Sequence, residues 1–552
     1  MTRIIRHAVP LWSAVLAVLV CAPLLGSGYV LSYDMVWVPH LAVTRADVWG
    51  LGSALPRAVP SDAFAGLLGA VLPAVLVQKT ILVGALFMAG LGMGRLLRPA
   101  PLVAQLAALT FYVWNPFVAE RLVLGHWPLL IAYAAVPWLI DAVKQDDGAT
   151  RPSVVIALAA TALTPATGLM GALIALSVKG KGEGQRFLII LMAAAVNAPW
   201  IVSGFLHSSI AKTDGAAVGL FDVQPEGVLG RVGAVLSLGG IWNLDVVPSS
   251  RGLAITVAFI VVIWAVMLVG IATMWAEERQ RLIGLSVVGA VGLALALSGW
   301  LLPGTMADVV REVPAGGLLR DGTRYLLLLA PLEAVAFGHG VRRIFDFSAT
   351  IRAKQFVAVI AVLVPIVALP DLAFGAGGAL KTSDYPRSWY DARAAIDGSK
   401  VPGDILVLPY SSYRQPTWNH RTPVLDPAGR FFPGETVTND VLLVSGKPIA
   451  GEDPRAAHIA RILNTARPAR ALAKVGIGIV VVETDAGPVK PRVLAGMTRI
   501  QHGDGIEVFT IAKAVPQVTK DSDRFAMIAA WTIAILALWF GLTRVVLDRL
   551  KR

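Results

Sequence analysis

The first candidate for a chemical role is an aspartate just after the first apolar run. Asp34 stands in the stretch Tyr33-Asp34-Met35-Val36-Trp37, among aromatic and apolar neighbours. A carboxylate is costly to desolvate at a membrane interface, so it usually has a partner or a task there. A positioned aspartate can accept the proton of a hydroxyl group that attacks an electrophile. The alternative is that Asp34 only caps the segment that follows, and the sequence leaves both interpretations open.

A second set of polar residues occupies a short loop between two later apolar runs. Glu120, Arg121 and His126 bring an acid, a cation and an imidazole close together there. Because the loop is short, they must lie at the membrane surface, and the order of the crossings puts them on the same side as Asp34. Glu120 can assist an acid–base step or bind hydroxyl groups, while Arg121 and His126 can contact a phosphate. The alternative is that Glu120 and Arg121 simply pair with each other.

Basic residues near the outer ends of two other spans suit an anionic ligand. Arg320 and Arg324 flank Thr323 in a short polar stretch, and arginine is suited to bidentate contacts with phosphate. Cations on the outer face run against the positive-inside bias, which favours a functional explanation. Lys79 is a weaker candidate of the same type, because snorkelling of a long side chain to the interface explains it as well.

The sequence offers few other reactive groups. Its single cysteine, Cys21, lies inside the first apolar run, so an internal disulfide is excluded. No spaced set of Cys and His residues predicts a zinc site, and no Walker-type loop predicts ATP binding. The energy of any reaction would therefore come from an activated substrate or from an ion gradient.

The elements that position these residues are membrane spans. Of the 552 residues, 56% are hydrophobic and only 15% are charged, and the mean hydropathy is +0.68. In soluble domains roughly a quarter of the residues are charged, so the excess apolar surface here faces lipid. The formal net charge of +12 comes mainly from short Lys and Arg patches between apolar runs. Membrane topology explains that pattern without nucleic acid as a partner.

Apolar runs long enough to cross a bilayer recur through residues 1–375 and appear once more in residues 524–552, before a basic tail. The run Ser153–Val178 is interrupted by a Thr-Pro-Ala-Thr-Gly segment at 164–168, which predicts two short helices that turn within the membrane. With that run counted twice, the clusters of basic residues all fall on one side. The sequence therefore predicts a polytopic α-helical membrane bundle with about 12 crossings and both termini cytoplasmic.

Two long polar regions should then lie on the outer face. One is the first outer loop, residues 27–78, and the other is residues 376–523, which are rich in polar and turn-forming residues. Within the second region, Asp404–Leu408 and Val475–Val482 have the pattern of strands, and Pro454–Arg467 has the pattern of a helix. This alternation predicts a small extracytoplasmic α/β domain.

Turn chemistry adds a hairpin to this domain. A Gln-His-Gly-Asp-Gly segment at 501–505 separates the apolar stretches Met497–Ile500 and Ile506–Ile511. Glu483 and Asp485 follow a predicted strand, where sites in open α/β sheets tend to lie. Solvated charges in a turn are the simpler explanation of these two acids.

The polar motifs and their order resemble the GT-C superfamily of integral membrane glycosyltransferases. The resembling features are an aspartate in a long first outer loop, a polar second outer loop and an extracytoplasmic domain after the bundle. The closest likeness is to actinobacterial cell-envelope members, the arabinofuranosyltransferase-like proteins. In those proteins an Asn-Pro-aromatic segment precedes a Gly-polar-Trp element, as at 115–117 and 125–127 here, and a later Arg-Asp-x-x-Arg element resembles 320–324.

The resemblance implies a multi-pass enzyme of the plasma membrane that works among membrane lipids and without nucleotide sugars. Its donor would be a polyprenyl-phosphate-linked sugar, arabinofuranose or mannose, and its acceptor a cell-envelope polysaccharide or glycolipid. Asp34 would be the general base and Glu120 a second catalytic acid or base. The residues expected to bind the phosphate or sugar of the donor are Arg121, His126, Arg320, Arg324 and Lys79.

One departure from the family bears on metal use. Many GT-C enzymes carry two adjacent acids in the first outer loop, whereas Met35 follows Asp34 here and the next acid is Asp47. No metal ligands can be assigned, and a divalent cation is neither required nor excluded. The competing interpretation is a transporter of lipid-linked glycans or a non-catalytic scaffold of envelope assembly. A carrier should hold charges at mid-membrane, and because only Glu333 does so clearly, the sequence favours an enzyme at the interface.

Overall fold

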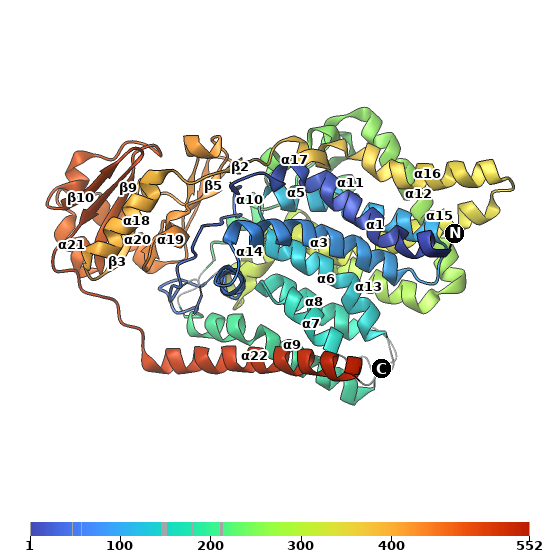
Figure 1. The fold of residues 1–552 in the computed structure, drawn as a ribbon, viewed down its shortest axis with the longest axis horizontal. Helices are drawn as coiled ribbons and strands as arrows, with labels where there is room; N and C mark the ends of the chain where they lie inside the picture. The colour runs from blue at the N-terminus through green and yellow to red at the C-terminus, as the bar shows by residue number, and fades with distance from the viewer. Residues whose placement is uncertain are drawn as a thin grey trace.

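The computed structural model of the protein describes residues 2–46, 48–56, 58–144, 152–177, 182–209 and 213–550. Asp47, the acid that follows Asp34 in the sequence, lies outside these ranges. A helical bundle makes up most of the molecule, and an α/β unit sits at one end of it (Figure 1). The N- and C-termini both lie at the opposite end of the bundle (Figure 1).

Long apolar helices form the bundle. Eight helical segments among the described residues are long and apolar enough to cross a membrane. They are α1 (Thr2–Cys21), α3 (Ala74–Leu96), α4 and α5 taken together (Leu102–Val113 and Pro116–Val123), α9 (Glu183–Leu206), α12 (Ala254–Glu277), α13 (Arg279–Leu301), α16 (Ile351–Ala368) and α22 (Asp521–Leu550).

The 12 predicted crossings are therefore not confirmed, and helix length and charge are the reason. The apolar helices α6 (Trp127–Val143), α7 (Pro152–Thr161) and α8 (Pro165–Ser177) are shorter than a span of about 20 residues. Helix α15 (Ala330–Phe347) carries several charged residues. The predicted division of the run Ser153–Val178 into two helices is confirmed, with the break at residues 162–164.

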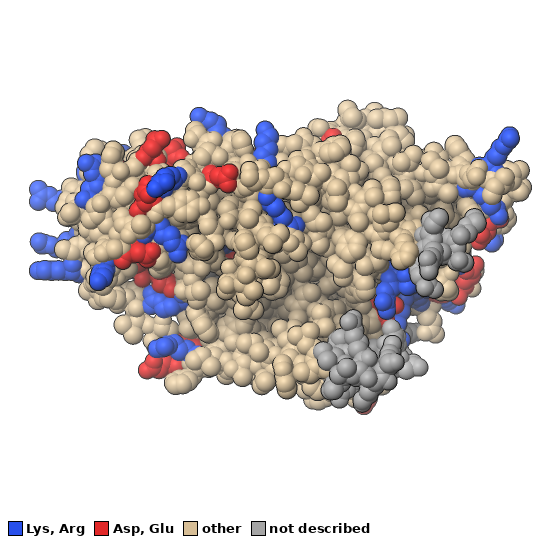
Figure 2. All heavy atoms as spheres, in the orientation of Figure 1, with Lys and Arg blue, Asp and Glu red and all other residues tan. Residues whose placement is uncertain are grey.

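The charged residues on the surface are unevenly distributed along the long axis of the bundle. Figure 2 shows Lys, Arg, Asp and Glu gathered at the two ends of the molecule, with a broad and largely uncharged belt between them. Exposed apolar side chains such as Leu268, Val287 and Ile535 belong to the helices of this belt. A belt of this kind is the surface that a bilayer covers.

The C-terminal α/β unit contains a mixed five-stranded sheet in the order β10-β11-β9-β3-β6. Strand β3 runs parallel to β9 and β6, and β11 runs antiparallel to β9 and β10. The strands are β3 (Asp404–Leu408), β6 (Thr436–Val437), β9 (Ile477–Glu483), β10 (Thr498–Gly503) and β11 (Ile506–Thr510). The predicted strands at 404–408 and 475–482, and the predicted hairpin around 501–505, are confirmed.

The two faces of this sheet are buried in different ways. Ile405 and Val407 of β3 belong to the core that continues into the membrane bundle. Leu406 and Leu408 of the same strand pack on the opposite face with residues of α20 (Pro454–Leu463) and α21 (Ala469–Lys474). A sheet covered on both faces reads as a continuous apolar run, which explains the sequence of β9.

Strand pairing ties the α/β unit to the first loop of the bundle. Strand β1 (Tyr29–Val30) pairs with β2 (Thr382–Ser383), and Tyr33 forms a bridge with Val424 of β5 (Val424–Leu425). Arg430 also binds Asp62 across the same boundary, at 2.8 Å. The loop that carries Asp34 is therefore held between the bundle and the C-terminal unit.

Candidate active site

Asp34 lies on a tight turn that two distant segments hold in place. Tyr33 has a φ of 45°, in the left-handed region that non-glycine residues rarely adopt. Its backbone N–H donates to Pro423 O at 2.6 Å, and its carbonyl accepts from the N–H of Leu425 at 2.8 Å. The N–H of Asp34 donates to Leu124 O at 3.1 Å. The side chain of Asp34 is 42% exposed.

Gly125 allows the second loop to pack against this turn. It has a φ of 83°, and a Cβ atom there would lie 2.2 Å from Met35 N and 2.4 Å from Ser32 O. Any other residue would push the two loops apart, because backbone atoms cannot give way as a flexible side chain can. The Gly-His-Trp element at 125–127 therefore has a structural reason: its glycine brings His126 to Asp34.

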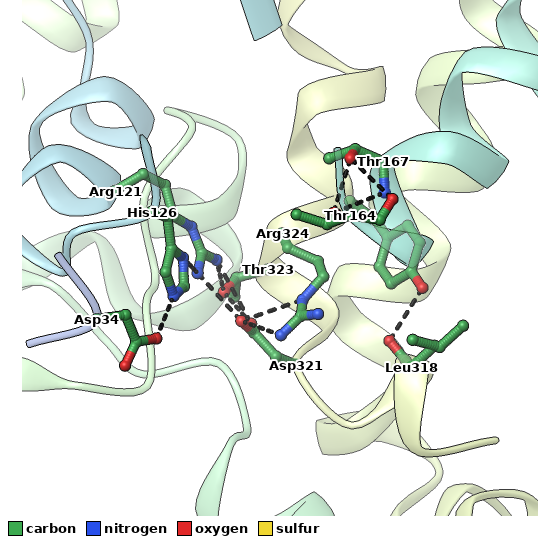
Figure 3. Close-up of polar contacts among 10 residues, drawn as sticks. Asp34, Arg121, His126, Thr164, Thr167, Leu318, Asp321, Thr323 and Arg324 are labelled. Carbon is green, nitrogen blue, oxygen red and sulfur yellow. Dashed lines mark hydrogen bonds and ion pairs between the residues drawn. The ribbon is translucent and has the colours of Figure 1, made fainter. Parts of the chain in front are cut away.

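His126 binds the carboxylate of Asp34 directly (Figure 3). Its Nε2 lies 3.1 Å from Asp34 Oδ2, and its Nδ1 lies 3.3 Å from Nη1 of Arg121. A guanidinium group can only donate hydrogen bonds, so Nδ1 accepts and the ring proton belongs on Nε2, which donates to Asp34. Burial lowers the pKa of His126, although the nearby Asp34 opposes the shift. The neutral tautomer that this geometry requires is therefore the favoured one.

Arg121 and Arg324 share the carboxylate of Asp321 behind this histidine (Figure 3). Arg121 Nη1 lies 3.0 Å from Asp321 Oδ2, and Arg324 Nη2 lies 3.1 Å from the same oxygen. Thr323 accepts from Arg121 Nη2 at 2.7 Å and donates to Asp321 at 2.9 Å. Burial alone would raise the pKa of Asp321, but the two guanidinium groups outweigh it and hold that pKa well below its ordinary range.

The two arginines differ in their access to solvent. The side chain of Arg121 is 1% exposed, and its charge is paired with the buried carboxylate of Asp321. The side chain of Arg324 is 25% exposed and its charge acts on Asp34. Arg324 is therefore the more accessible of the two cations, whereas Arg121 contacts His126 and Asp321 inside the protein.

Tyr413 brings the C-terminal unit into the site. It lies in β4 (Tyr413–Arg414), its hydroxyl donates to Asp34 Oδ1, and its ring meets that of Tyr33 edge-on at 6.5 Å. The next residue, Arg414, is buried and binds Asp426 at 2.9 Å and Glu483 at 3.1 Å. Glu483, an acid at a strand end, thus anchors the strand that carries Tyr413.

Glu120 leads to a different cluster. The residue is 3% exposed, and its carboxyl faces Glu226 and does not form the alternative pair with Arg121. Glu226 binds Arg251 at 2.7 Å, and Arg251 donates to Ser237 Oγ at 2.7 Å. Adjacent residues of α5 point in different directions around the helix, so Glu120 and Arg121 enter separate networks.

Two of the expected donor-binding residues contact other parts of the chain. Arg320 lies over the ring of Phe221 at 5.0 Å and 3.5 Å from Glu452, a residue of the C-terminal unit. Lys79 donates to Gly26 O near the end of α1. Asp34, His126, Arg121 and Arg324 therefore form the part of the expected site that the structure brings together.

The Asn-Pro-Phe segment at 115–117 is structural. Asn115 caps α5, because its side chain accepts from Val118 N at 3.1 Å while its amide donates to Phe111 O and Tyr112 O. Pro116 takes the first helical position, where its missing N–H has no cost. This cap fixes the start of the helix that presents Glu120 and Arg121.

Sequence reasoning missed Tyr413 and gave no separate role to Asp321 and Thr323. Asp321 and Thr323 lie inside the Arg-Asp-x-x-Arg element at 320–324, so the motif pointed to them. Tyr413 lies 379 residues from Asp34, and no local pattern marks it. Within the described residues, no group of three or more His, Cys, Asp or Glu side chains could hold a metal ion.

This bundle, with its α/β unit, has the fold of a membrane-embedded arabinofuranosyltransferase. The cryo-EM structure of the arabinofuranosyltransferase AftD from Mycobacteria aligns with 92% of this chain and 40% of its own, at 15% identity and a TM-score of 0.55. A mutant of AftD aligns with 94% of this chain and 42% of its own, at 16% identity and a TM-score of 0.56. This chain thus spans less than half of the length of either. No protein-family model and no curated protein sequence matches it.

The predicted likeness to arabinofuranosyltransferase-like proteins is confirmed for the fold by these two AftD structures. At this level of identity the likeness concerns the path of the chain and not the residues of the site.

Proposed function

We propose that the protein is a membrane glycosyltransferase that moves arabinofuranose or mannose from a polyprenyl-phosphate donor to a cell-envelope polysaccharide or glycolipid. The fold supports a glycosyltransferase in general, and the position of the site at the end of the bundle beside the α/β unit supports a substrate held at the membrane surface. One observation carries the proposal. Asp34 carries an exposed carboxylate at the end of the helical bundle, and groups from three separate parts of the chain orient it.

The transfer step needs a base for the acceptor. The acceptor hydroxyl oxygen attacks the anomeric carbon, and the bond from that carbon to the phosphate oxygen breaks with its electron pair on the phosphate. Asp34 accepts the hydroxyl proton. Each of its oxygens has two lone pairs, so accepting from Tyr413 or His126 leaves the carboxylate able to bind a hydroxyl. The two donors fix the orientation of the base before the substrate arrives.

The leaving group is anionic and needs a cation nearby. Arg324 is the best placed of the expected donor-binding residues, because it is partly exposed and its charge acts on Asp34. Its guanidinium can make charge-assisted hydrogen bonds to the phosphate oxygens. His126 orients the carboxylate of Asp34, and Arg121 holds His126 in place. Glu120 is assigned to a buried structural cluster and not to proton transfer.

Replacement of the base tests the proposal. Asp34→Asn is nearly isosteric but cannot accept a proton, so we expect transfer to fall about 10²–10⁴-fold while donor binding and folding are retained. Glu120→Gln is the matched control, and its transfer should stay close to that of the wild type. The readout is transfer of radiolabelled sugar from a polyprenyl-phosphate donor by purified protein. Normal transfer in Asp34→Asn, or loss of transfer only in Glu120→Gln, would contradict the assignment of the base.

The outer-face location is tested by labelling. Ser411 and Ser445 are exposed residues of the C-terminal unit, and Cys21 is fully buried. We expect cysteines at 411 and 445 to react with a membrane-impermeant maleimide in intact cells, with both termini inaccessible. Labelling of these cysteines only after lysis would place the site on the cytoplasmic face.

A further inference from the structure

A groove lies at the end of the bundle opposite Asp34. It has a volume of about 190 Å³ and runs between α6, α8 and α13, with Leu328 and Pro331 at its base. The 17 residues of α6 separate His126, next to Asp34, from Lys144 at the groove. At about 1.5 Å per residue this is close to the thickness of a hydrocarbon core. The groove therefore opens at the other surface of the membrane belt.

The mouth of the groove is cationic. Lys144, Arg281, Gln280 and Ser177 line it. Burial and the charge of Arg281 lower the pKa of Lys144 to about 8. An anion bound beside Lys144 and Arg281 would offset their repulsion and favour the charged form of Lys144.

The acids near the mouth already have partners. Glu278 binds Arg281 Nη1 at 2.7 Å, and Asp141 binds Arg95 at 2.9 Å. The buried Nε of Arg281 makes no hydrogen bond to any described residue, although its Nη2 donates to Leu96 O at 3.0 Å. Among the described residues, a buried donor of Arg281 is thus unpaired, and an anionic ligand would match it together with the ammonium of Lys144.

The inner wall of the groove is apolar. Ile140, Ile174, Leu285 and Val288 form it. Leu285 and Val288 lie one and two turns beyond Arg281 on α13, so the wall reaches roughly 10 Å into the belt. Gly284 keeps the groove open, because a Cβ atom there would meet only Ser177 O, at 3.9 Å.

We propose that this groove binds an anionic phospholipid of the leaflet opposite to Asp34. The phosphate lies between Lys144 and Arg281, and one acyl chain follows Ile140, Ile174 and Val288. A free phosphate accounts for the charged mouth but not for the apolar wall at membrane depth. Ordinary snorkelling accounts for the lysine but not for the buried donor of Arg281 or the open space beside Gly284. The site is independent of the proposed transfer reaction.

Native mass spectrometry of the full-length protein, with added phosphatidylglycerol or phosphatidylcholine, tests the proposal. We expect selective retention of phosphatidylglycerol, and about tenfold weaker binding in Lys144→Gln, because one charge-assisted contact is lost. Lys354→Gln is the matched control, since Lys354 lies over Phe345 outside the groove. Equal binding by Lys144→Gln and Lys354→Gln, or equal retention of the two lipids, would overturn the proposal.

A second variant separates a lipid from a free phosphate. Gly284→Leu fills the apolar part of the groove and leaves both cations in place, so it should weaken phosphatidylglycerol binding while inorganic phosphate competes as before. If Gly284→Leu binds phosphatidylglycerol as the wild type does, the acyl chain does not use the groove and the lipid assignment is wrong. Thermal unfolding of each variant in detergent shows that the comparison is made on folded protein.

Discussion

Two neighbouring residues of α5 begin two networks of opposite character. Arg121 belongs to the Asp34 cluster, which consists of Asp34, Arg121, His126, Asp321, Thr323, Arg324 and Tyr413. Glu120 belongs to the Glu120 cluster, which consists of Glu120, Glu226, Ser237 and Arg251. The Asp34 cluster ends in a carboxylate that is 42% exposed, whereas every member of the Glu120 cluster is buried.

The difference shows that polar side chains in one short segment can belong to separate networks with different roles. A charge that reaches solvent can meet a substrate directly, whereas removal of one partner from a buried charge network mainly costs stability. The Glu120 cluster fastens the segment around Glu226 and Arg251 to the bundle. The Asp34 cluster joins the first loop, the second loop and the C-terminal unit around one open carboxylate.

The largest expected effect concerns the stability role of the Glu120 cluster. Arg251→Met removes the cation from between buried carboxyl groups, and breaking a buried pair in this way costs about 3–5 kcal/mol of unfolding free energy. Thermal unfolding in detergent should show a marked loss for Arg251→Met. Arg311→Met is the control, because Arg311 is 55% exposed where it pairs with Asp308. Similar unfolding temperatures for the two variants would remove the structural role of the Glu120 cluster.

The contribution of the C-terminal unit to the Asp34 cluster is the next test. Tyr413→Phe keeps the ring against Tyr33 but removes one hydrogen bond to a carboxylate, which is worth about 1.5–3 kcal/mol. We expect kcat to fall tenfold or more while the donor KM stays nearly constant. Tyr390→Phe, at a 43% exposed tyrosine of the same unit, serves as the control. A fall in kcat that is the same in both variants would mean that the hydroxyl of Tyr413 does not orient the base.

Arg324 distinguishes donor binding from catalysis within the Asp34 cluster. Arg324→Gln should raise the donor KM about tenfold, because a charge-assisted contact to phosphate is lost. The fold should survive, since Asp321 keeps its bonds to Arg121 and Thr323. Steady-state kinetics with varied donor measure the effect, and Arg387→Gln, at an arginine with a 93% exposed side chain, controls for the change of charge. An unchanged KM would return Arg324 to a purely structural role.

The smallest expected effect is a pH dependence that only the Asp34 cluster should show. The pKa of His126 is lowered in the folded protein, so below about pH 6.5 the unfolded chain takes up the proton first and stability falls. Protonation also removes the acceptor for Arg121. Unfolding temperatures between about pH 5 and pH 7 should fall more steeply toward acid in the wild type than in His126→Gln. Parallel curves for the two proteins would exclude His126 as the titrating group.

The sequence by itself determined the membrane class, the polar loops and the main strands of the C-terminal unit, and it marked Asp34 as a candidate site residue. Each of these follows from local pattern, because apolar run length, alternation and turn residues act over a few residues. The Gly-His-Trp element at 125–127 and the element at 320–324 lie in segments that make contacts within the Asp34 cluster. The 12 predicted crossings are not confirmed, since short apolar helices such as α7 and α8 resemble spans in composition but not in length.

Only the tertiary structure decided which of these residues meet. Arg121 and Asp321 lie 200 residues apart in the sequence, and Tyr413 lies 379 residues from Asp34. No local rule fixes such pairs, because they depend on how helices turn their faces and on close backbone approaches such as that of Gly125 to Met35. The same geometry places Glu120 in a separate buried cluster, although its neighbour Arg121 contacts His126 and Asp321 of the Asp34 cluster. Packing determines which groups a charged residue contacts, whereas the sequence alone shows that the residue lies near the end of an apolar segment.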